Sequence, residues 1–229
     1  MLNFQQKEIF LKKYFDVLKK CSLFNGIEEK DITIMLNCLG AKIDNFDKKY
    51  TIFAEGKPAR YIGILLSGTA QIIQIDYFGN RSILSTVEAG NSFAEAFACN
   101  DNSILPISVI ANEPCEVMFI DSRHIMHTCT NCCGFHQQLI YNLMKELAIK
   151  NIAFHQKIDV TSKRTTKEKL LTYLNQQAKK ANSNRFTIPF DRQGLADYLE
   201  VDRSGLSVEI GKLKKEGVLD SHKNYFELL

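Results

Sequence analysis

The residues best suited to specific chemistry lie near the C-terminal end, where Asp202 is followed by Arg203, Ser204 and Ser207. Asp202 is a favourable N-cap for a helix over residues 203–216, so these side chains would project from its first turns. Arginine can form two parallel hydrogen bonds with guanine, and serine can bond bases or phosphates. The pattern therefore predicts a helix that reads base edges in the major groove of DNA.

Further side chains near this helix are suited to the sugar–phosphate backbone. Arg192 and Gln193 would begin a preceding helix over residues 192–199, and Lys212 and Lys223 lie further along the chain. Cations in these places would neutralise phosphates. Helix, tight turn, helix and a closing hairpin are typical of a winged helix-turn-helix. The alternative is a small helical domain with a solvated basic face.

Charge is unevenly distributed along the chain. The 229 residues have a formal net charge of +3. Residues 163–229 carry 13 Lys and Arg against 9 Asp and Glu, whereas residues 1–162 carry 16 against 17. The positive excess therefore lies in the last third, as expected of a module that faces a polyanion.

Composition favours a folded cytoplasmic protein. A hydrophobic content of 45% excludes global disorder. No apolar run reaches the roughly 18–20 residues of a membrane span, so we expect no membrane partner. The first residues lack the apolar core of a signal peptide, and the seven cysteines do not resemble a disulfide scaffold.

The segments upstream predict the elements that position this module. Residues 41–121 contain short β-branched segments bounded by glycine, such as 61–68 and 70–75, and a turn signal at 78–81. Residues 134–158 predict a helix about 37 Å long. Its apolar stripe would pair with the same helix of a second subunit, the alternative being its own β domain. The stripe consists of Leu139, Ile140, Leu143, Met144, Leu147 and Ile152.

These patterns together predict an α+β protein with three parts. Residues 1–133 form an N-terminal antiparallel β-roll, a cupin-like jelly roll, with helices at its N-terminal end. Residues 134–158 form the long dimerisation helix, and residues 159–229 form the C-terminal winged helix-turn-helix. The nucleophile, metalloprotease and nucleotide-loop motifs GxSxG, HExxH, GxxxxGK[ST] and GxGxxG do not occur, so no enzyme is expected.

Residues 190–207 read FDRQGLADYLEVDRSGLS and are similar to the helix-turn-helix signature of the Crp/Fnr superfamily of bacterial transcription regulators. The order of β-roll, long helix and winged helix resembles that family over nearly the whole chain. The resemblance implies a homodimer on a palindromic operator in double-stranded DNA, with RNA polymerase as a further partner. It matches Arg203 to the family's leading base-reading arginine. Val208 stands where a second arginine is common, which leaves the half-site sequence open.

The resemblance also implies an effector pocket in the β-roll. Members that bind cyclic AMP place a glycine–glutamate pair on the ribose and an arginine–serine pair on the phosphate. Glu95 matches the glutamate, and it could bind an effector hydroxyl or a cation, or cap a helix. The candidate pocket residues are Gly90, Phe93, Ala94, Glu95 and Ala96, with Leu105 and Pro106 in place of the arginine–serine pair.

The pocket segment lacks a cation that could neutralise a phosphate. No Lys or Arg occurs between Arg81 and Arg123, so no shift of a few residues would place a cation in this segment. Burying a phosphate without a local cation is costly. We therefore expect an unidentified small-molecule effector and not cyclic AMP in the family's usual manner.

A cluster of cysteines offers an alternative function. Cys129 and Cys132 have CxxC spacing, and Cys133 follows directly. A redox- or metal-sensing regulator could use them, but a lone CxxC without a second ligand pair is a weak candidate, so no metal site is predicted. A β-roll that binds a metabolite and has no role on DNA is a further alternative.

Overall fold

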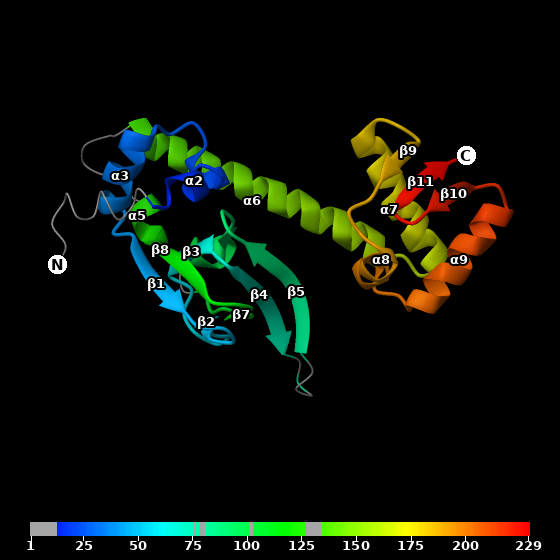
Figure 1. Ribbon diagram of the computed structural model, residues 1–229, viewed down its shortest axis with the longest axis horizontal. Coiled ribbons are helices and arrows are strands. Elements are labelled where there is room, and N and C mark those ends of the chain that lie inside the picture. The colour runs from blue at the N-terminus through cyan, green and yellow to red at the C-terminus, as the bar shows by residue number, and fades with distance from the viewer. Residues whose placement is uncertain (1–12, 76, 78–80, 101–102, 127–133) are drawn as a thin grey trace. The chain divides into compact units, whose positions relative to one another are not determined.

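The computed structural model describes residues 13–75, 77, 81–100, 103–126 and 134–229. The chain divides into two compact units, Met1–Ala148 and Ile149–Leu229, and helix α6 (Gly134–Thr161) runs through both (Figure 1). The helix extends beyond the predicted end at residue 158. Because the division falls inside α6, the helix belongs partly to each unit, and the three-part division stays a prediction.

Two four-stranded antiparallel sheets form the β-roll of the N-terminal unit, as the sequence predicted. Their orders are β1-β8-β3-β6 and β2-β7-β4-β5 (Figure 1). Strands β4 and β5 pair in antiparallel fashion, while the turn expected between them falls mostly outside the described residues. The strands are β1 (Lys42–Phe46), β2 (Thr51–Phe53), β3 (Tyr61–Ser67), β4 (Thr69–Ile75), β5 (Arg81–Glu88), β6 (Ser92–Phe93), β7 (Ser108–Ala111) and β8 (Cys115–Asp121).

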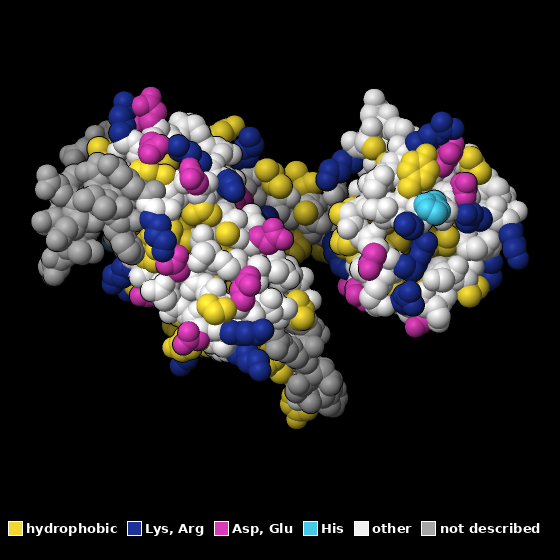
Figure 2. All heavy atoms as spheres, in the orientation of Figure 1, with side chains coloured by type: hydrophobic (Ala, Val, Ile, Leu, Met, Phe, Trp, Pro, Cys, Tyr) yellow, Lys and Arg dark blue, Asp and Glu magenta, His cyan; other side chains and the backbone are white. Residues whose placement is uncertain are grey.

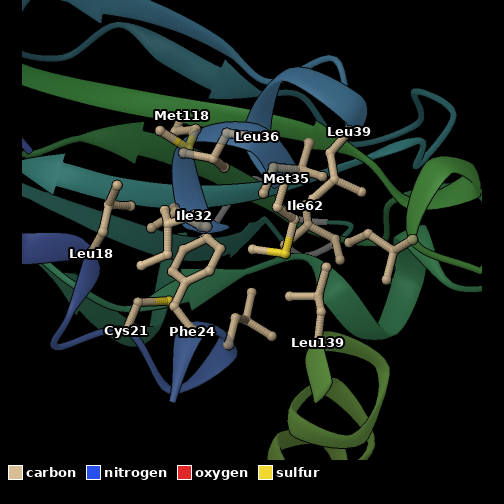
Figure 3. Packing of buried hydrophobic residues seen from close by; sticks show 14 of the residues in the cluster. Leu18, Cys21, Phe24, Ile32, Met35, Leu36, Leu39, Ile62, Met118 and Leu139 are labelled. Carbon is tan, nitrogen blue, oxygen red and sulfur yellow. The ribbon is translucent and has the colours of Figure 1, made fainter. Parts of the chain in front are cut away.

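Short helices and the first half of α6 pack against one face of the roll. Alternate residues of β3 point toward them, so Ile62 and Ile64 share a buried core with Met35 of α3 and Leu139 of α6 (Figure 3). This core fixes the start of α6 on the β-roll. The short elements are α2 (Phe15–Leu18), the 3₁₀ helix η1 (Ser22–Phe24), α3 (Glu29–Cys38), α4 (Glu95–Ala98) and α5 (Ser122–Met126).

Aromatic side chains fill the interior of the roll. Phe53 lies 5.5 Å, ring centre to ring centre, from both Phe93 and Phe119. Gly63 of β3 faces the same ring cluster, and a Cβ there would lie 2.2 Å from Phe93. The ring of Phe93 therefore occupies the space that a side chain at position 63 would need.

The end of α6, helices α7, α8 and α9 and a small sheet form the C-terminal unit. The sheet order is β10-β11-β9, and buried side chains of all three helices share a core with Phe226 of β11. The elements are α7 (Thr166–Ala181), β9 (Arg185–Thr187), α8 (Arg192–Leu199), α9 (Arg203–Lys215), β10 (Leu219–His222) and β11 (Tyr225–Leu228). The helix-turn-helix and the closing hairpin predicted from the sequence are present.

The turn between α8 and α9 depends on one left-handed residue. Glu200 has φ 54°, and its backbone N–H bonds the carbonyl oxygens of Ala196 and Asp197. A residue with a side chain is strained in this region by roughly 1–2 kcal/mol, whereas glycine adopts it freely. The sharp reversal that brings α9 across α8 therefore stores local strain.

Relief of this strain gives a first prediction. We expect Glu200→Gly to have a free energy of unfolding about 1 kcal/mol above that of Glu200→Ala, measured by urea denaturation. Both variants lose the 3.3 Å ion pair between Glu200 and Lys157. The difference between their free energies of unfolding therefore reports the backbone strain at position 200. An alanine variant as stable as the glycine variant would show that position 200 is unstrained.

Candidate nucleic-acid interface and effector pocket

Helix α9 has one buried and one exposed face. Leu206, Ile210 and Leu213 pack into the core of the unit, and Arg203 lies on the exposed side. Asp202 caps the helix, since its carboxylate accepts a 2.8 Å hydrogen bond from the backbone N–H of Gly205. The cap fixes the first turn, from which the predicted base-reading side chains project.

The hydroxyl groups of the first turns have local partners. Ser204 Oγ donates to the carboxylate of Asp202, and Ser207 Oγ donates to the carbonyl oxygen of Arg203 at 3.0 Å. The hydroxyl of Ser204 and the N–H of Gly205 keep the pKa of the Asp202 carboxyl below its ordinary value. Both hydroxyl oxygens remain exposed and can still accept a hydrogen bond.

Arg192 lies at the first turn of α8, with its guanidinium half-buried 5.9 Å from the ring of Phe226. Its buried Nη1 has no acceptor among the described residues. Burial lowers the pKa of Arg192, and the charge of Arg203 lowers it further. Arg192 and Arg203, which the sequence predicted separately, therefore lie close enough for the charge of one to affect the pKa of the other. Such a pair is well placed for an anion such as a phosphate.

The remaining predicted phosphate contacts lie on the surface of this unit. Gln193 Nε2 donates to Asp197 Oδ1 at 2.8 Å, which ties it to its own helix. Lys212 is exposed and lies 3.6 Å from Glu209. Lys223 is exposed in the turn of the β10–β11 hairpin, as expected of a wing residue.

The candidate effector residues divide into two groups. Phe93, Ala94, Glu95 and Leu105 are buried, whereas Ala96 and Pro106 are exposed. Gly90 has φ 92°, as glycine readily adopts. The structure therefore places only part of the predicted set inside the roll.

The backbone at Ala94 keeps a conformation that glycine would favour. Its φ is 64°, in the left-handed region, and it immediately precedes Glu95 at the start of α4. Alanine therefore holds a conformation that costs it roughly 1–2 kcal/mol and that glycine would adopt freely.

Residues 43–132 match the family model of the cyclic nucleotide-binding domain. The match spans the strands from β1 to β8. The chain has the Crp/Fnr fold. The family model does not reach residues 190–207, so their resemblance is supported by the shared fold alone.

Solved structures share this fold at low sequence identity. CprK complexed with OCPA is 14% identical, with a TM-score of 0.62, and the match covers 86% of this chain and 88% of that chain. The c-di-GMP-responsive global regulator CLP of Xanthomonas campestris is 16% identical, with a TM-score of 0.55. The match covers 86% of this chain and 98% of that chain. The sensor domain of the transcriptional regulator DNR from Pseudomonas aeruginosa is 21% identical, with a TM-score of 0.50. The match covers 69% of this chain and 97% of that chain. No curated protein matches the chain.

In this Crp/Fnr fold, two polar residues of α6 that the sequence analysis missed attach the helix to the roll. Glu146 is 8% exposed and accepts hydrogen bonds from Ser22 Oγ, at 2.5 Å, and from Ser92 Oγ of β6. Asn142 Nδ2 donates to the carbonyl oxygens of Leu23 and Asn25, at 2.9 and 2.7 Å. Asn142 and Glu146 interrupt the apolar stripe at a spacing of four, which is the signal that could have revealed them.

Most of the predicted dimer stripe of α6 packs against its own unit, which is the alternative that the sequence left open. Leu139 and Leu143 are buried in the core of the N-terminal unit, and Ile140 and Leu147 pack against the same core. Met144 and Ile152 of the predicted stripe are exposed, at 65% and 58%. Helix α6 carries a second apolar face, and periodicity alone does not tell which face meets the roll. The exposed side chains of this helix include Tyr141, Met144, Ala148, Ile149 and Ile152.

The cysteine cluster at positions 129, 132 and 133 lies outside the described residues. Within the part of the chain that the structure describes, no three His, Cys, Asp or Glu residues are grouped to hold a metal ion. None of the described helices combines the length and the apolar character needed to cross a membrane.

Proposed function

We propose that the protein is a homodimeric, sequence-specific DNA-binding transcription regulator, controlled by an effector in the β-roll that is not cyclic AMP. The observation that carries the proposal is the pair Arg192 and Arg203 on the helix-turn-helix. A half-buried guanidinium with an unpaired N–H beside a second cation is costly in the free protein. An incoming phosphate would satisfy the N–H and reduce the repulsion, while Arg203 reaches a base edge.

The effector would act through α6. Ser92 lies directly before the pocket residues Phe93 to Ala96, and its hydroxyl bonds Glu146 of the helix. A ligand that displaces β6 would therefore strain or release a buried hydrogen bond to α6. Such a shift can alter the spacing of two recognition helices in a dimer, with RNA polymerase as the predicted partner at a promoter.

DNA binding is tested with duplexes enriched by the wild-type protein from a random pool. We expect the logarithm of affinity to fall linearly with the logarithm of salt concentration. We expect Arg203→Ala to weaken binding to the enriched duplex by about 1–3 kcal/mol. Lys179→Ala is the matched control, because it removes an exposed cation from α7 instead of α9. Absence of binding to enriched and bulk DNA at low salt would refute the proposal.

Dimerisation is proposed along the exposed apolar face of α6, where Figure 2 shows hydrophobic side chains on the surface of the helix. Ile152 is 58% exposed and Met144 is 65% exposed, with Ala148 between them at a spacing of four. Such a face suits pairing with a second copy, since helices associate through apolar residues spaced three and four apart.

Replacing a residue of this face should dissociate the dimer. We expect Ile152→Asp to sediment as a monomer at concentrations where the wild type sediments as a dimer, because a carboxylate would be buried between helices. Ala153→Asp places the same charge on another side of α6 and should remain dimeric. An Ile152→Asp variant that stays dimeric would place the interface elsewhere.

Cyclic AMP should not bind in the roll. We expect no heat of binding and no rise in melting temperature at millimolar cyclic AMP, because residues 82–122 contain no Lys or Arg. The phenylalanine rings around Phe93 also occupy the interior. A dissociation constant in the micromolar range would contradict this reading.

A further inference from the structure

Val208 is exposed on the face of α9 that the proposed function assigns to base reading. Its side chain is 59% exposed, and it lies four residues after Ser204 and three before Gly211. Residues at these spacings share one side of a helix. Leu206, Ile210 and Leu213 occupy the opposite, buried side, so Val208 points away from the core of its own unit.

Three of the four residues at spacings of three and four from Val208, namely Ser204, Gly205 and Gly211, are small and uncharged. A Cβ built on Gly211 would meet nothing within 4 Å. The two methyl groups of Val208 therefore stand out from this face. Lys212, the fourth neighbour, lies toward the C-terminal end, and Arg203 is the first residue of the helix. A charged border around an uncharged middle suits a helix whose ends meet phosphates and whose middle meets bases.

Helix stability does not explain valine at this position. Valine has a lower helix propensity than alanine, leucine, lysine or arginine, because its branched side chain loses rotamer freedom. An exposed valine gains little from burial in return. An exposed apolar side chain is ordinary by itself. Val208, however, lies at the centre of the exposed face of α9, where a side chain would contact bases under the proposed function.

The major groove presents one kind of apolar group. Thymine carries a 5-methyl group there, whereas cytosine, adenine and guanine present hydrogen-bonding groups. Valine can neither donate nor accept a hydrogen bond through its side chain, so it can distinguish bases only by apolar contact or by shape. We propose that Val208 contacts the 5-methyl group of a thymine in each half-site and thereby selects thymine at that position. The inference rests on the proposed function and deepens it.

The test removes the methyl group from the DNA and from the protein separately. Duplexes are first enriched with the wild-type protein, and each thymine is then replaced in turn by deoxyuridine, which differs only in lacking the methyl group. Affinities of the wild type and of Val208→Ala are measured by fluorescence anisotropy at one salt concentration. Circular dichroism confirms that both proteins have the same helix content, as expected for a change at an exposed position.

We expect deoxyuridine at one position of each half-site to weaken wild-type binding about fourfold per methyl group. Val208→Ala should lose sensitivity at that position and keep it at every other thymine. Replacing the same base pair by guanine–5-methylcytosine should bind the wild type more tightly than guanine–cytosine, and the alanine variant should not distinguish the two. Lys179→Ala is the matched control, because it alters an exposed side chain of α7 and should leave the sensitivity to deoxyuridine unchanged.

The outcomes separate the two proposals. If no duplex is enriched and none binds at low salt, the proposed DNA-binding function fails and the role of Val208 fails with it. If duplexes are enriched but wild type and Val208→Ala respond equally to deoxyuridine at every position, the methyl contact is refuted while DNA binding stands. The methyl contact is also refuted if the enriched motif contains no thymine, or if Val208→Ala binds the motif as tightly as the wild type does.

Discussion

The buried contact between α6 and the β-roll is the constraint on which the rest of the N-terminal unit depends. Leu139 and Leu143 supply apolar area, but apolar contacts alone would permit the helix to slide or rotate. Glu146 and Asn142 remove that freedom, because each has buried hydrogen-bond partners in one register only. A buried carboxylate is costly unless it is satisfied, so the two serine hydroxyls make this register strongly preferred.

A comparable constraint sets the geometry of the C-terminal unit. Asp191 and Asp202 cap α8 and α9 through the backbone N–H groups of Gly194 and Gly205, at 2.7 and 2.8 Å. Glu200 reverses the chain between the helices in a left-handed conformation. The two arginines thus come together because the caps and the turn leave little choice of angle. Leu195, Leu206 and Phe226 share the buried core that holds the two helices and the sheet in place.

The parts of this structure that local chemistry determines were predictable from the sequence. The capping box formed by Thr165 and Glu168, the limits of α8 and the start of α9 follow from cap residues and spacing. The partner of an apolar stripe cannot be read from the sequence, because α6 carries two such stripes. Only the tertiary structure shows which of them packs against the roll. The buried role of Glu146 was missed for the same reason, since its hydroxyl partners lie 54 and 124 residues away. Proximity of Arg192 to Arg203 likewise depends on tertiary packing.

The two departures from the pattern that the resemblance implies lie at positions to which the proposed function assigns specificity. Leu105 and Pro106 replace the pair that would hold a phosphate, and Val208 replaces an arginine on α9. Neither change disturbs the scaffold, because Leu105 joins the apolar core and Val208 is exposed. Under the proposed function, each would substitute apolar contact for charge recognition, one in the β-roll and the other on α9. A scaffold that fixes backbone positions through caps, left-handed turns and buried hydrogen bonds can accept such changes, because none of those interactions uses the altered side chains.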